Sequence, residues 1–128
     1  MSTPGPLHVV QTFIGEWPKG LAELRQAFSD WLAEDARYEN VGLTSTGTRD
    51  DAIALIDTFA EGLDNIAVDM LAIAQDGERV FTERVDYLRK ADGTVLATIR
   101  LMGIFVVRDG RIVEWRDYFH AAPPSGGA

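Results

Sequence analysis

The sequence predicts an α+β domain in which three N-terminal helices pack against a cone-shaped, curved antiparallel sheet of about four to six strands. Apolar residues recur at helical spacing through the first half of the chain, and from Ile66 onward they alternate as in strands. Three Asp-Gly pairs, which favour hairpin turns, divide the second half into strand-length segments. Helices followed by an antiparallel meander are typical of α+β domains, and a long curved sheet capped by helices leaves a cavity for a small ligand.

Length and charge narrow the classes of function. The 128 residues suffice for one domain, with residues 1–6 and 121–128 expected to be flexible ends. A net charge of −8 argues against nucleic acid as a partner, because a protein that binds nucleic acid needs a basic stripe on its surface. No apolar run is as long as a membrane span and the first residues do not resemble a signal peptide, so we expect a cytoplasmic protein with no membrane partner. The absence of cysteine excludes thiol catalysis.

The first half of the chain is expected to contain the helices. The first covers roughly residues 7–17, and the second carries an apolar stripe from Leu21 to Leu32. Thr48 is a candidate cap for the third helix, with Asp51 three residues later as a weak capping box. The apolar stripe of this third helix runs over residues 52–63.

The remaining segments predict loops and strands. Residues 35–41 show no helical stripe and include Tyr38 and Asn40, which would share one side of an extended segment; the alternative is a helix end followed by a polar loop. Residues 42–47 are expected to form a loop. Strands are expected over residues 66–72, 79–89, 94–107 and 111–120, with turns at the three Asp-Gly pairs.

Three charged residues occupy strand positions that could face the core. Asp117 alternates with Trp115 and Phe119 on the more apolar face of the last strand, where a buried carboxylate is costly unless it is paired and hydrogen-bonded. Arg84 and Asp86 are two residues apart, so they share one face of an earlier strand. If the two intervening turns keep these side chains on the same face of the sheet, one arginine and two aspartates meet in a pocket.

The strand over residues 94–107 decides whether these charges meet, because Asp-Gly turns occur in forms that differ by one residue. This strand contributes either Ile99 and Leu101 or Arg100 and Met102 to the shared face. We prefer the first pair because its row is uniformly apolar. If the three side chains do not meet, Arg84 and Asp86 would form an ordinary surface ion pair, and Asp117 would be an exposed aspartate near a strand end.

Several kinds of catalytic site have no signature in the sequence. There is no phosphate-binding loop, dinucleotide fingerprint, nucleophile elbow or metal-ligand cluster, and His8 and His120 lack ligand spacing. We therefore expect no metal and no cofactor.

Four segments resemble the limonene-1,2-epoxide hydrolase family in order and spacing. They are Tyr38-Glu39-Asn40, Gly47-Thr48-Arg49-Asp50, Thr82-Glu83-Arg84-Val85-Asp86, and Gly103-Ile104-Phe105 followed by Trp115-Arg116-Asp117-Tyr118-Phe119. The resemblance runs from about Ala36 to Phe119, and the helices before it match only in kind. The Glu-Arg-Val-Asp and Trp-Arg-Asp-Tyr-Phe segments are together specific, since neither is general to the wider nuclear-transport-factor-2-like superfamily. His120 departs from the acidic residue frequent in the family, at a position that alternates away from Asp117.

The resemblance implies a one-step, cofactor-free addition of water to an epoxide that yields a vicinal diol. Asp117 would be the general base that takes a proton from water, and Tyr38 and Asn40 would hold that water. Asp86 would be the general acid that protonates the epoxide oxygen, and Arg84 would hydrogen-bond both carboxylates. Relatives are often homodimers through the outer sheet face, so a homodimer is also expected, with Phe105 and Tyr118 on that face.

The remaining pocket would be apolar and suited to a terpene-like or cyclic epoxide. Its expected substrate-binding residues are Phe59, Leu63, Leu88, Ile99, Leu101, Trp115 and Phe119. A ketosteroid-isomerase-like proton-transfer enzyme is one alternative, although Arg84 would hold its acid ionised. A non-catalytic ligand-binding cone domain is another, although such a domain does not need three ionisable groups.

Overall fold

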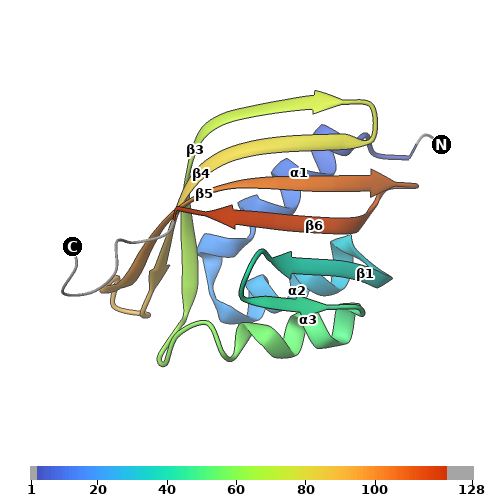
Figure 1. Cartoon of the computed structure of the whole chain (residues 1–128). Helices are drawn as coiled ribbons and strands as arrows, with labels where there is room; N and C mark the ends of the chain where they lie inside the picture. The colour runs from blue at the N-terminus through green and yellow to red at the C-terminus, as the bar shows by residue number, and fades with distance from the viewer. Residues whose placement is uncertain (1–2, 121–128) are drawn as a thin grey trace.

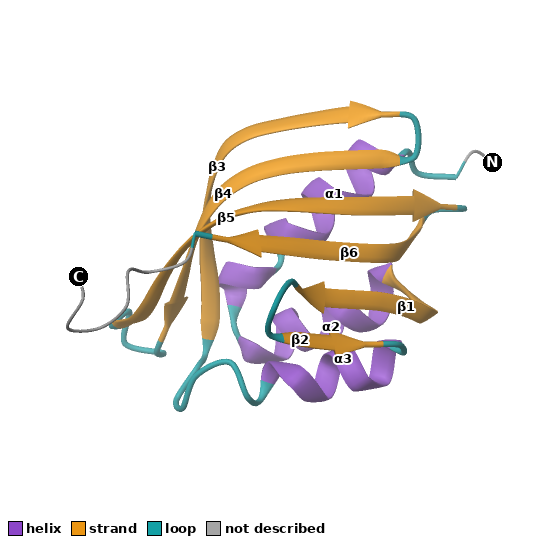
Figure 2. Cartoon of the chain, viewed as in Figure 1, coloured by secondary structure: helices purple, strands orange, loops and turns teal. Residues whose placement is uncertain are grey.

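The computed structural model describes residues 3–120, and its helices lie on one face of a six-stranded sheet (Figures 1 and 2). The elements in chain order are α1 (Pro6–Gly15), the 3-10 helix η1 (Trp17–Lys19), α2 (Leu21–Trp31), β1 (Leu32–Asn40), β2 (Thr44–Thr46), α3 (Arg49–Ile56), β3 (Asn65–Asp76), β4 (Arg79–Arg89), β5 (Val95–Arg108) and β6 (Arg111–Phe119). None of the described helices is long and apolar enough to cross a membrane.

The strand order is β2-β1-β6-β5-β4-β3, which confirms the α+β class and corrects one part of the prediction. Strands β3 to β6 form the expected antiparallel meander. Strand β1 pairs parallel with β6, and the short β2 pairs antiparallel with β1. The sheet is therefore mixed rather than wholly antiparallel, and the loop expected over residues 42–47 contains β2.

The helices differ from the expectation at their ends. Pro6 occupies the first position of α1, where its missing N–H costs nothing, so it already belongs to a helix. Helix α3 ends at Ile56, and Phe59 and Leu63 lie in the turns that follow it. Residues 1–2 and 121–128, which we expected to be flexible, lie outside the described residues.

The predicted cap of α3 is confirmed. The backbone N–H of Asp51 donates to Thr48 Oγ1 at 3.1 Å, which satisfies one of the free N–H groups at the start of the helix. Asp50 and Asp51 also place negative charge in the first turn, where the helix dipole favours it.

The strand register confirms the preferred alternative for β5. Arg84 pairs with Leu101 and Asp86 pairs with Ile99 across β4 and β5. Across β5 and β6, Asp117 lies opposite Gly103. All three charged residues therefore share the inner face of the sheet with the apolar row of β5.

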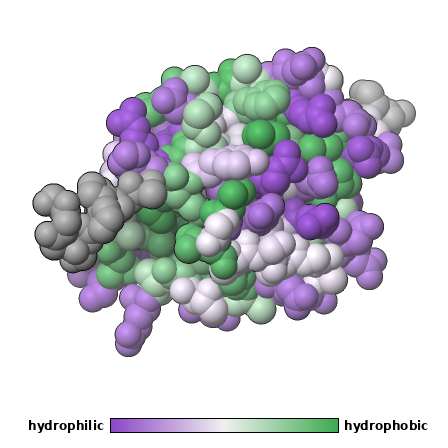
Figure 3. Space-filling model, in the orientation of Figure 1, coloured by the Kyte–Doolittle hydropathy of each residue, from purple (hydrophilic) through white to green (hydrophobic). Residues whose placement is uncertain are grey.

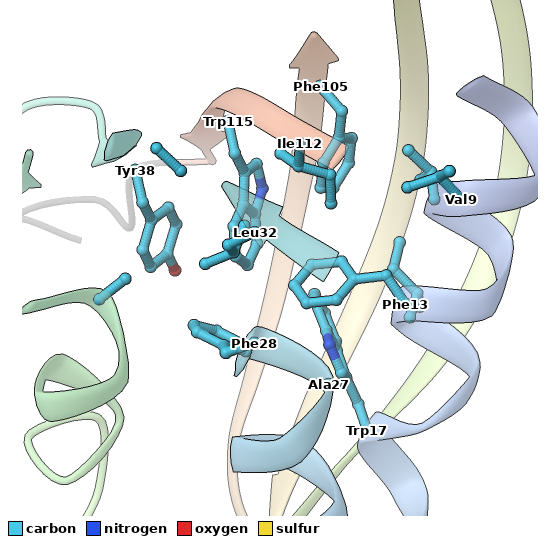
Figure 4. Close-up of a cluster of buried hydrophobic side chains, with 14 of the residues drawn as sticks. Val9, Phe13, Trp17, Ala27, Phe28, Leu32, Tyr38, Phe105, Ile112 and Trp115 are labelled. Atoms are coloured by element: carbon cyan, nitrogen blue, oxygen red, sulfur yellow. The ribbon is translucent and has the colours of Figure 1, made fainter. Parts of the chain in front are cut away.

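Aromatic rings fill the space between this inner face and the helices (Figure 4). Trp115 stacks on Tyr38 at a centroid distance of 3.9 Å and on Phe105 at 5.2 Å. Phe13 of α1 meets the Trp115 ring edge-on at 5.3 Å. Trp115 is thus packed between rings on several sides, and this packing holds β6 in place two residues before Asp117.

The outer face of the sheet is mixed in character. Figure 3 shows hydrophobic side chains gathered near the middle of the viewed face, among hydrophilic ones. Met102 and Tyr118 lie opposite each other on β5 and β6, and they are 55% and 44% exposed. The expected position of Phe105 on this face is wrong, because Phe105 belongs to the inward-facing row of β5 and is fully buried against Trp115.

Candidate active site

A cavity of about 370 Å³ lies beside the inner face of the sheet, and its lining is mostly apolar. Six of the expected substrate-binding residues line it, namely Phe59, Leu88, Ile99, Leu101, Trp115 and Phe119. Leu63 is not among the lining residues; it is half-buried and packs against the core. Sequence reasoning missed Trp17 and Phe28 from the helices, and Leu43, Thr44, Leu55, Thr58 and Ile66.

Arg84 connects the two carboxylates on the inner face. Its side chain is fully buried, and its Nε and Nη2 donate to Asp86 Oδ1 and Oδ2 at 3.1 and 3.0 Å. Nη2 also donates to Asp117 Oδ2 at 3.2 Å, and Nη1 reaches Asp117 Oδ1 at 3.5 Å. A planar guanidinium can brace two carboxylates at once in this way, which a lysine could not. The predicted convergence of the three charges is therefore present.

Asp117 is buried and accepts a further hydrogen bond. Trp115 Nε1 donates to Asp117 Oδ1 at 2.8 Å. Burial raises the pKa of the Asp117 carboxyl above its ordinary value, and Asp86 acts in the same direction, while Arg84 and Trp115 oppose the rise. Trp115 thus holds the carboxylate as well as lining the cavity, a role that sequence reasoning did not assign to it.

Tyr38 and Asn40 reach the same side of the cavity from β1. The parallel pairing sets Tyr38 opposite Trp115 and Asn40 opposite Asp117. Tyr38 Oη donates to Asn40 Oδ1 at 3.2 Å, and Asn40 Nδ2 donates to Thr44 Oγ1 at 2.9 Å. Burial raises the pKa of the Tyr38 hydroxyl far above its ordinary value, so this group stays neutral.

Two further residues shape the charged cluster, which consists of Arg84, Asp86 and Asp117. Thr82 Oγ1 accepts from Arg84 Nη1 at 2.9 Å and donates to the Gly103 carbonyl at 3.3 Å. At Gly103, an added Cβ would lie 2.5 Å from Asp117 Oδ1 and 2.6 Å from Arg84 Nη1. The signal available in the sequence was a glycine within the apolar row of β5, directly across from Asp117.

Together these groups can move protons at an apolar surface. One carboxylate can take a proton from a bound water while the other gives a proton to a leaving oxygen. Within residues 3–120, no group of three or more His, Asp or Glu side chains is arranged to hold a metal ion. The two buried carboxylates are bridged by Arg84.

Comparison with known proteins gives consistent results. The family model described as limonene-1,2-epoxide hydrolase catalytic domain matches residues 5–123. Epoxide hydrolase EphG of Mycobacterium tuberculosis is 39% identical over 89 residues; the match covers 69% of this chain and 57% of that relative, so the chain spans little more than half the relative's length.

Solved structures agree with this. The structure of an M. tuberculosis LEH-like epoxide hydrolase has a TM-score of 0.72 and 29% identity, covering 88% of this chain and 80% of that one. An NTF2-like protein of unknown function from Cytophaga hutchinsonii has a TM-score of 0.70 at 16% identity, covering 94% and 95% of the two chains, and therefore shares the fold.

Proposed function

The chain belongs to the limonene-1,2-epoxide hydrolase family, and we propose that it is an epoxide hydrolase that adds water to a small apolar epoxide to give a vicinal diol. The observation that carries this proposal is the fully buried Arg84 bound to two carboxylates beside an otherwise apolar cavity. The family match begins at residue 5, so it extends over the helices before Ala36, where the resemblance of the motifs is weakest.

Asp117 is the proposed general base. An epoxide is strained, but water attacks it slowly unless a base removes a proton as the new C–O bond forms. Asp117 borders the cavity, and its raised pKa makes it a stronger base than a surface aspartate. Neutral Tyr38 and Asn40 can orient the water from β1 without adding charge.

Asp86 is the proposed general acid. It also borders the cavity, and its proton passes to the epoxide oxygen as the ring C–O bond breaks. Two ionised carboxylates with one guanidinium would leave a net negative charge in a buried place, and this favours one bound proton in the cluster. Arg84 contacts both carboxylates, so a cluster that carries one proton is neutral overall and contains both an acid and a base.

The cavity supports a small, uncharged substrate. Its volume of about 370 Å³ is near the lower end of the range usual for small-molecule pockets, and rings and aliphatic side chains form most of its wall. A terpene-like or cyclic epoxide fits this description better than a sugar or a phosphate. The reaction as written consumes epoxide and water and needs no cofactor.

A single-turnover experiment in water enriched in oxygen-18 tests the mechanism. Limonene oxide and cyclohexene oxide are incubated with excess enzyme, and the diol is analysed by mass spectrometry. We expect labelled diol from the wild type and from Asp35→Asn, which changes an exposed aspartate, and none from Asp117→Asn. Unlabelled diol from the wild type would mean that a protein carboxylate supplied the oxygen, and direct attack by water would be wrong.

An inactive wild type would point to the alternatives. If neither epoxide yields diol, a 3-keto-5-ene steroid tests the isomerase alternative, and calorimetric binding of the same compounds tests the binding-only one.

We further propose a homodimer formed through the outer sheet face, which the exposed Met102 and Tyr118 support. Light scattering of the purified chain measures its mass directly.

The cytoplasmic location stays a prediction.

A further inference from the structure

A tight turn brings Thr44 beside the proposed water-holding residue Asn40. The N–H of Leu43 donates to the carbonyl of Asn40 at 2.8 Å, and between them Gly42 has a φ of +84°, in the left-handed region that glycine adopts without strain. Strand β2 then pairs with β1 so that Thr44 lies opposite Asn40. The short edge strand thus has a specific relation to the site.

The side-chain amide of Asn40 has a partner at each end. Its Oδ1 accepts from the Tyr38 hydroxyl at 3.2 Å, and its Nδ2 donates to Thr44 Oγ1 at 2.9 Å. Within residues 3–120, Thr44 is the one hydrogen-bond partner of this Nδ2. The last torsion of asparagine is soft and nearly two-fold, so one partner leaves the amide free to rotate, whereas two fix its plane.

From this arrangement we infer that Thr44 is a positioning residue, which fixes the Asn40 amide so that its oxygen stays available to the attacking water. The inference rests on the proposed function. The Tyr38 hydroxyl cannot do this alone, because a hydroxyl can donate to the amide oxygen or accept from the amide NH₂. An amide that turned over would present donors where the water needs an acceptor for its proton.

The position of Thr44 makes its role separable from folding. Thr44 lies on a three-residue edge strand and is exposed as a residue, so its hydroxyl contributes little to the core. Thr12 offers a control, because it lies on α1 outside the cavity lining and, among the described residues, its hydroxyl contacts the ring of His8, at 3.4 Å. Valine replaces threonine with nearly the same shape and removes the hydroxyl in both cases.

The experiment compares Thr44→Val, Thr44→Ser and Thr12→Val by steady-state epoxide hydrolysis. We expect Thr44→Val to lower kcat about threefold to tenfold, as for loss of one hydrogen bond, with KM changed less than about twofold. Thr44→Ser should restore kcat, and Thr12→Val should keep it. A Thr44→Val enzyme with wild-type kcat, or a Thr44→Ser enzyme as slow as Thr44→Val, would overturn the inference.

A second readout does not depend on turnover. The two side-chain amide protons of Asn40 can be observed by ¹⁵N-resolved NMR and assigned with Asn40→Asp. We expect both signals to shift in Thr44→Val and to remain in place in Thr12→Val. Unchanged Asn40 signals in Thr44→Val would refute the positioning role, whereas shifted signals in an enzyme inactive on every epoxide would refute the proposed function and leave the contact established.

Discussion

Replacing Gly103 by alanine is a severe test of the charged cluster. The added Cβ would lie 2.5 Å from Asp117 Oδ1, 2.6 Å from Arg84 Nη1 and 3.1 Å from Thr82 Oγ1. None of these atoms is at the free end of a mobile chain, since Arg84 and Trp115 hold Asp117, and the carboxylates hold Arg84. The cluster must therefore open to admit the methyl group.

The size of the effect follows from these distances. To restore a tolerable contact of about 3 Å, Asp117 Oδ1 and Arg84 Nη1 must each move by roughly half an ångström. Misplacement of catalytic groups by about 1 Å can cost about a hundredfold in rate, so we expect kcat to fall roughly tenfold to a hundredfold. Overpacking of this kind also destabilises a core by about 1–3 kcal/mol.

Turnover of a cyclic epoxide and thermal unfolding of the same preparations measure both effects. Gly47→Ala is the control, because a Cβ there has no neighbour within 4 Å and the backbone is not in the left-handed region. A Gly103→Ala enzyme with the kcat and melting temperature of the wild type would refute the claim that an empty glycine position is needed to hold the cluster together.

Further predictions concern charge, pH and helix capping. Arg84→Met should abolish hydrolysis and destabilise the fold by about 3–5 kcal/mol, because it leaves buried carboxylates unpaired. Arg108→Met, which breaks an exposed pair with Glu78, should leave the urea midpoint close to that of the wild type, and equal losses of stability in the two variants would contradict this. The pKa of Asp117 is raised in the folded state, so the folded protein binds this proton more tightly than the unfolded chain does. As the pH rises from about 3.9, the ordinary pKa of aspartate, through the raised pKa, the wild type should therefore lose stability relative to Asp117→Asn. Urea unfolding from about pH 4 to about pH 8 checks this sign, and parallel curves would disprove it. Thr48→Ala should lower stability by about 1 kcal/mol and leave kcat unchanged, because it removes only the cap of α3; a large fall in kcat would tie α3 to the chemistry.

The second half of the fold was predictable because local signals agree there. Strong alternation and the Asp-Gly turns gave strands close to their observed bounds, and the uniformly apolar row of β5 selected the observed register. Once the register is known, the two-residue spacing of Arg84 and Asp86 brings both toward Asp117. The convergence of the charges was therefore predictable from strand geometry, while the roles proposed for them came from the resemblance.

The first half was harder because its pairing is non-local. Strand β1 carries charged residues such as Glu34 and Arg37 and changes register against β6 between Leu32 and Arg37, so its alternation is weak. Phe59 continues the helical spacing of α3 although the helix has ended, since it faces the cavity from a turn. The contact of Thr44 with Asn40 depends on a turn whose form no apolar pattern records.

The strand order has a consequence for how the molecule folds. Strand β6 is the last described element of the chain, yet it lies between β1 and β5, and Asn40 pairs with Asp117 only when this central strand is inserted. Pairing across such sequence separation costs loop-closure entropy and is slow, and before it forms both β1 and β5 present open edges to other chains. Sheet completion and assembly of the proposed catalytic groups are thus one event. Activity regained during refolding should therefore follow the slowest structural phase, and partly folded chains should aggregate and show no slow hydrolysis.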